Sequence, residues 1–156
     1  MRLPELLREL GDGLGLGEVA VDEGDGATLV VDDTFEITIE PGPEGRGIVI
    51  VASVGVVPKD DALPVCRTLL EANVGGLDTG GAALGLDPDD GTVMLSRAIL
   101  TDEMPFAVFD RELTVFMTAL RDWTTRLKTG VLTAEADGPS PQEAGDANPP
   151  HGGLRV

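Results

Sequence analysis

The longest periodic stretch of the sequence runs from residue 105 to residue 128. Its apolar side chains recur every three or four positions, the spacing that places residues on one face of an α-helix. They are Phe106, Phe109, Leu113, Phe116, Leu120, Trp123 and Leu127. Pro105 suits the first helical position, and Arg126 and Lys128 suit the C-terminal end of a helix dipole. The stretch therefore predicts a long amphipathic helix.

Two shorter stretches also have helical spacing. Residues 2–10 carry one stripe of leucines, and Gly11 and Gly13 are expected to end that helix because glycine relaxes the backbone. Residues 60–73 return to the same spacing, and glycines that follow at residues 75 and 76 are expected to end the second helix. Its apolar stripe contains Leu63, Cys66, Leu69 and Leu70.

Five segments have the character of strands. Residues 34–40 alternate apolar and polar side chains, so one face of that strand should be buried and the other exposed to water. Residues 48–57 are apolar almost without interruption, as expected of a strand covered on both faces. Residues 28–32 form the strand before these two. Residues 82–86 and 92–100 form a hairpin around turn-forming residues.

The order of elements is therefore α-β-β-β-α-β-β-α. Hairpin-length links join most of the strands, which predicts an α+β domain over residues 1–130 with a mostly antiparallel twisted sheet packed by helices. Residues 131–156 are rich in proline and glycine and show no apolar period, which predicts a disordered tail.

The charge argues against two classes of partner. The chain has 28 acidic and 11 basic residues, a formal net charge of −17 that repels nucleic acid and anionic membrane surfaces. The N-terminal residues lack the apolar core of a signal peptide, and no apolar run approaches the roughly 18 residues of a membrane span. We therefore expect a cytoplasmic protein.

Side chains suited to catalysis or metal binding are scarce. The single histidine, His151, lies in the expected tail, and the single cysteine, Cys66, lies on an apolar helix face with no histidine near it to activate the thiol. The glycines of residues 11–17 do not fit a dinucleotide fingerprint, and residues 87–91 lack the glycine position of an EF-hand loop. We expect no enzyme activity, no cofactor and no metal.

One region carries a family resemblance. Leu69-Leu70-Glu71-Ala72-Asn73 resembles a Leu-Leu-x-x-Asn motif at the end of a helix, and it is followed by the glycine-rich residues 80–86 and by Leu95-Ser96-Arg97. Together with Trp123 in the last helix, these motifs resemble the CesT-like (Tir chaperone) family of type III secretion chaperones over about residues 1–129. The proline- and glycine-rich tail departs from the family pattern.

The resemblance implies a homodimer that binds a secreted effector protein without ATP or catalysis. The effector's N-terminal chaperone-binding segment is expected to bind in extended form, with pocket residues drawn from Leu6, Leu7, Leu10, Phe35 and Ile37. The expected dimer interface contains Leu63, Cys66, Leu69, Leu70 and Leu84. Ordinary core packing is an equally good interpretation of each residue taken singly. The alternative function is a same-fold scaffold, inhibitor or regulatory protein that binds a different protein client.

Overall fold

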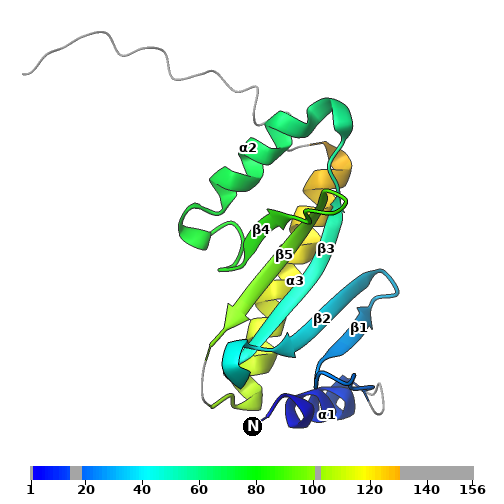
Figure 1. The fold of residues 1–156 in the computed structure, drawn as a ribbon, viewed down its shortest axis with the longest axis vertical. Helices are drawn as coiled ribbons and strands as arrows, with labels where there is room; N and C mark the ends of the chain where they lie inside the picture. Colours follow the sequence, from blue (N-terminus) through cyan, green and yellow to red (C-terminus); the bar gives the residue numbers. More distant parts are fainter. Residues whose placement is uncertain (1, 15–18, 101–102, 131–156) are drawn as a thin grey trace, which may run out of the picture.

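The computed structural model describes residues 2–14, 19–100 and 103–130, which contain three α-helices and one five-stranded sheet (Figure 1). The helices are α1 (Leu3–Leu14), α2 (Ala62–Ala72) and α3 (Phe106–Thr129). The strands are β1 (Ala27–Val31), β2 (Phe35–Pro41), β3 (Ile48–Val56), β4 (Ala83–Leu86) and β5 (Thr92–Ile99). This confirms the predicted order of elements and the α+β class.

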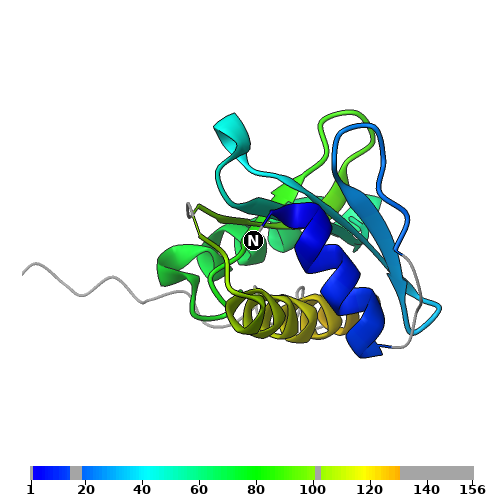
Figure 2. The ribbon, with the colours of Figure 1, turned by 90° about the horizontal axis from the view of Figure 1, so that it is seen from below.

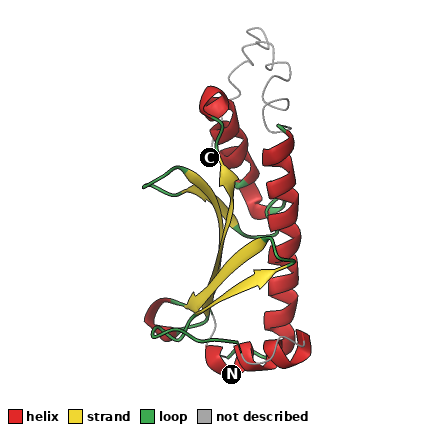
Figure 3. Ribbon diagram, turned by 90° about the vertical axis from the view of Figure 1, so that its right-hand side faces the viewer, coloured by secondary structure: helices red, strands yellow, loops and turns green. Residues whose placement is uncertain are grey.

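The sheet is antiparallel throughout, in the order β1-β2-β3-β5-β4. The strand register places Leu29, Ile37, Ala52, Leu95 and Leu84 in one row across all five strands. All five side chains are buried, so this row belongs to the inner face of the sheet. The helices α1 and α3 cover that face (Figures 2 and 3).

The long helix α3 supplies the largest buried side chains. Phe109, Phe116, Leu120 and Trp123 are almost completely buried at the three- and four-residue spacing expected from the sequence. Burial of each such side chain stabilises the fold by about 1.5–3 kcal/mol relative to exposure. The core therefore lies between the inner face of the sheet and the helices α3 and α1, and buried residues of α2 also belong to it.

Two local expectations were wrong. The helix α1 does not end at Gly11 but continues through Gly13 to Leu14. Glycine costs a helix interior about 1 kcal/mol relative to alanine. Burial of the leucine stripe of α1 outweighs that cost.

The second wrong expectation concerns β3, which is covered on one face only. Ile48, Ile50, Ala52 and Val54 are buried, whereas Val49 and Val51 are partly exposed and Ser53 is exposed. The reason is that α1 and α3 both pack on the inner face. The outer face of β1, β2 and β3 is open in the described part of the chain.

The chain after residue 130 is outside the described residues. Helix α3 ends at Gly130, whose φ of 70° is the left-handed conformation that glycine adopts easily. The predicted tail of residues 131–156 falls beyond this point and stays a prediction.

Candidate functional site

An apolar cleft opens between α1, β1 and α3. Its apolar walls come from Leu10, Leu29, Val31, Ile37, Leu113 and Met117. We call it the β1 cleft; its volume is about 220 Å³. Asp110 and Arg121 of α3 add polar groups to its lining. Its size and lining suit one or two aliphatic side chains of a bound chain.

The strand β1 forms the edge of the sheet beside this cleft. Its sequence, Ala-Thr-Leu-Val-Val, contains no charge and no proline, and Val30 is 60% exposed. Edge strands that must not pair with another chain usually carry a lysine, a proline or a bulge. The edge of β1 has none of these devices, so it can accept the backbone of a further strand.

One of the lining residues of the β1 cleft, Arg121, forms an ion pair. Arg121 of α3 donates to a carboxylate oxygen of Asp32 at 2.7 Å, and both side chains are at least half exposed. Exposed pairs of this kind contribute about 0–1 kcal/mol. The pair therefore orients the β1–β2 turn against α3 without adding much stability.

The structure brings together only part of the predicted pocket. Leu10 and Ile37 line the β1 cleft, and Leu6 lines a separate cavity of about 530 Å³ beside Arg2 and Met104. Leu7 is completely buried in the core, and Phe35 is half-buried opposite Val31 at the start of β2. Their role in client binding stays a prediction.

Four apolar residues that line the cleft were missed by sequence reasoning. Leu29 and Val31 alternate along β1, which was a usable signal for one buried face. Leu113 and Met117 are four residues apart on α3, so they lie on one side of that helix. Both pairs of residues line the same cleft only because α3 packs on the sheet in this position.

The helix α2 forms a second candidate surface. Leu63 is 81% exposed and Leu70 70%, and Val74 and Leu77 beyond the helix are 79% and 90% exposed. We call these four residues the α2 surface. The opposite face of α2 carries Val65, which is buried in the core. The helix itself lies beside β4, the edge strand of the sheet (Figure 1). So α2 is apolar on both faces.

The predicted dimer residues divide between exposed and buried positions. Leu63 and Leu70 are exposed and Cys66 is partly exposed, whereas Leu69 and Leu84 are buried within the chain itself. Val74 and Leu77 were missed because they follow the helix rather than continue its periodicity.

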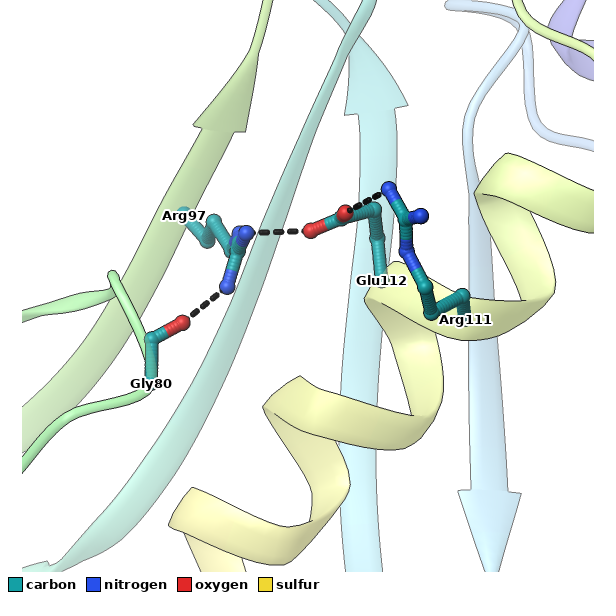
Figure 4. Close-up of polar contacts among 4 residues, drawn as sticks. All are labelled: Gly80, Arg97, Arg111 and Glu112. Carbon is teal, nitrogen blue, oxygen red and sulfur yellow. Dashed lines mark hydrogen bonds and ion pairs between the residues drawn. The ribbon is translucent and has the colours of Figure 1, made fainter. Parts of the chain in front are cut away.

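Polar contacts hold the segment that carries the α2 surface. The side-chain amide of Asn73 donates to the backbone oxygen of Leu84 and accepts from its backbone N–H, both at 2.9 Å. Arg97, on the inner face of β5, donates to the backbone oxygen of Gly80 and to the carboxylate of Glu112 on α3 (Figure 4). Residues 73–84 are thereby tied to both the sheet and α3.

We expect Glu112→Ala to lower the free energy of unfolding by about 2–3 kcal/mol. The Arg97 and Glu112 side chains are only 18% and 12% exposed, and loss of one partner leaves a nearly buried charge. Denaturant unfolding, followed by far-ultraviolet circular dichroism, measures the loss.

The matched control is Arg111→Gln. Arg111 also donates to Glu112, at 2.9 Å, but is 68% exposed, so its loss should cost less than about 0.5 kcal/mol. Equal losses in the two variants would contradict a structural role for the Arg97 pair.

Within residues 2–14, 19–100 and 103–130, no group of three or more histidine, cysteine, aspartate or glutamate side chains is arranged to hold a metal ion. No helix in those same ranges is both long and apolar enough to cross a membrane.

The sequence also matches known proteins. Residues 5–124 match the profile of the family described as the Tir chaperone protein (CesT) family. A protein of Chlamydia pneumoniae is 26% identical over 130 residues, which cover 82% of this chain and 98% of that relative.

Solved structures share the fold. A chain of the HopA1–SchA chaperone–effector complex superposes with a TM-score of 0.63 at 21% identity, over 78% of this chain and 91% of that chain. The type III secretion chaperone SycH of Yersinia pestis, in complex with a stable fragment of YscM2, gives a TM-score of 0.60 at 20% identity, over 80% and 98%. YbjN of E. coli, described as a candidate transcription regulator, gives a TM-score of 0.59 at 16% identity, over 81% of this chain and 92% of that chain. At these identities the likeness establishes the fold alone.

Proposed function

The chain belongs to the Tir chaperone protein (CesT) family, and from that premise we propose that it is a type III secretion chaperone for a bacterial effector. In this proposal it binds the N-terminal chaperone-binding segment of the effector in the cytoplasm. Binding keeps that segment soluble and competent for secretion. The protein acts by binding and not by catalysis.

The observation that carries the proposal is an unprotected strand edge beside an apolar cleft. An extended effector segment adds to β1 through backbone hydrogen bonds, which any sequence can make. Every second side chain of that segment then points to the inner side of the sheet, where the β1 cleft lies. Leu10 and Ile37 are almost completely buried in the single chain, and they belong to the wall of the cleft that these effector side chains approach.

The proposed homodimer uses the other end of the molecule. The four residues of the α2 surface are large apolar side chains that water surrounds in the single chain. A two-fold axis would let this surface complement itself. The β1 edge lies at the opposite end of the sheet from β4, so a dimer through α2 leaves two client sites open.

A second candidate function is a regulator that binds a different protein client. The E. coli protein described as a candidate transcription regulator shares the fold, so the fold is compatible with this role. Purification from the native cell separates the two: recovery of a secreted effector supports the chaperone, and recovery of only a non-secreted protein supports the regulator.

The chaperone proposal predicts the thermodynamics of binding. Calorimetric titration with an effector's N-terminal fragment, with chelator present and ATP absent, should show binding with a clearly negative heat-capacity change. The reason is that ordering an extended segment requires burial of a large apolar area. Affinity should fall only modestly from low to physiological salt. A requirement for ATP or for a metal would refute this mechanism.

A matched pair of variants tests the location. Phe35→Glu should weaken effector binding by at least about tenfold, because it places a carboxylate beside Val31 at the edge of the client site. Leu100→Glu, at a position that is 62% exposed and outside the cleft, is the control. Both variants should remain dimeric in light scattering. Equal affinity of the two variants would place the client elsewhere.

A further inference from the structure

The proposed function leaves open which chemistry of client segment the β1 edge selects. A strand added beside β1 directs alternate side chains to opposite faces of the sheet. One set points toward the apolar β1 cleft. The other set lies on the outer face, which no described element covers near β1.

The outer face beside β1 is acidic. The register pairs Val30 with Glu36 and Thr28 with Thr38, and Glu40 follows on the same face of β2. Both glutamates are exposed, and neither has an ion-pair partner among the described residues. β1 itself contributes only the short side chains Thr28 and Val30 to this face.

The acidity extends through the surrounding sequence. Residues 9–45, which contain β1 and β2 with their connections, hold eleven acidic residues and not one lysine or arginine. Arg121 of α3 pairs with one of these carboxylates, that of Asp32. The segment around the β1 edge thus carries a net negative charge, and Glu36 and Glu40 place two exposed carboxylates on the outer face of the neighbouring strand β2.

Distance favours a direct contact with a client's cations. Neighbouring strands lie about 4.8 Å apart, so an added strand lies roughly 10 Å from β2. A lysine or arginine side chain on the outer face can extend over Thr28 or Val30, and the glutamate side chains cover the remaining distance. A glutamate at the same client position would meet like charges instead.

We propose that this chain selects a client segment in which apolar and basic side chains alternate. This inference rests on the proposed function and goes beyond it in naming the segment's pattern. The apolar side chains enter the β1 cleft. The basic side chains lie on the outer face and pair with Glu36 and Glu40. Apolar contact supplies most of the affinity, and the charges decide between clients.

Synthetic peptides test the pattern directly on the full-length protein. The first three are alternating valine–lysine, valine–glutamate and valine–threonine peptides of equal length. A fourth has the composition of the lysine peptide but all its valines in one block. Dissociation constants are measured by calorimetry at low salt. The lysine peptide should bind at least about tenfold tighter than the glutamate peptide, since Glu36 and Glu40 attract the outer-face charges of the lysine peptide and repel those of the glutamate peptide.

Charge reversal supplies the site-specific evidence. The double variant Glu36→Lys with Glu40→Lys should reverse the preference, so that the glutamate peptide binds tighter. The control is Glu44→Lys, an exposed position in the β2–β3 connection that adds a cation off the β1 edge. This control should keep the wild-type order of affinities. Added salt should shrink the preference while the threonine peptide keeps its affinity.

The outcomes separate this inference from the proposed function. Equal binding of the three alternating peptides, each tighter than the block peptide, would refute charge selection and leave the β1 edge as the client site. Reversal by Glu44→Lys as well would show a general field effect and refute pairing at Glu36 and Glu40. If no alternating peptide bound more tightly than the block peptide, both the β1 client site and the inference would be wrong.

Discussion

Replacement of Leu70 by aspartate is expected to convert a dimer into a monomer that keeps its fold. Leu70 is 70% exposed in the single chain, so a carboxylate there remains in water and does not disturb the core. In a two-fold dimer the same substitution occurs twice, once from each subunit. Two lost leucine contacts cost about 4 kcal/mol, which corresponds to roughly a thousandfold weaker association.

Light scattering at micromolar concentration measures this effect. The wild type should have about twice the chain mass of 16.2 kDa, and Leu70→Asp should have the chain mass itself. Leu100→Asp removes a leucine that is 62% exposed and directly follows β5, and this variant should stay dimeric. A wild-type mass of about 16 kDa would refute the dimer. A dimeric Leu70→Asp variant would move the interface away from the α2 surface.

The buried and exposed residues of α2 could not be told apart from the sequence. Its apolar residues surround the helix, so periodicity alone could not tell which of them face the chain's own core. Leu69 and Leu70 are neighbours in the sequence, yet the first is buried and the second exposed. The division depends on how residues 73–84 return to the sheet, which Asn73 fixes through its two bonds to Leu84. No local pattern encodes that contact.

Other elements were predictable because their periodicity is local. The alternation of Phe35, Ile37 and Ile39 predicts β2, and the three- and four-residue steps of α3 predict its buried face. The β1 cleft was only partly predictable. Leu10 and Ile37 could be named from their patterns, but Leu113 and Met117 reach them only through the packing of α3 against α1 and the sheet.

Uniform apolar character was misleading in β3. A run of valines and isoleucines predicts burial on both faces, yet the side chains between the buried ones are partly or fully exposed. Apolar residues are common on protein surfaces, so such a run does not require a second covering layer. In this chain, the open face also carries the acidic residues of β2 on which the proposed client selection depends.

Trp123→Ala is expected to cause the largest loss of stability of any single substitution considered for α3. Trp123 is 1% exposed, and its indole N–H donates to the backbone oxygen of Asp78 at 3.0 Å. Truncation leaves a cavity between α3 and residues 77–79, which adjoin the α2 surface. Such truncations cost about 3–5 kcal/mol. The melting temperature should fall by about 10 °C or more for a domain of this size.

Two further variants divide this loss into its parts. Trp123→Phe keeps most of the volume and removes the bond to Asp78, so it should cost about 1–2 kcal/mol. Thr124→Val, at the next residue, removes a buried hydroxyl that has no hydrogen-bond partner in the described part of the chain, so stability should be equal or higher. Circular dichroism at one fixed protein concentration follows all three, because dimerisation makes the melting temperature depend on concentration. If Trp123→Ala melted within about 3 °C of the wild type, Trp123 could not be what holds residues 77–79 against α3, and the α2 surface would need another support.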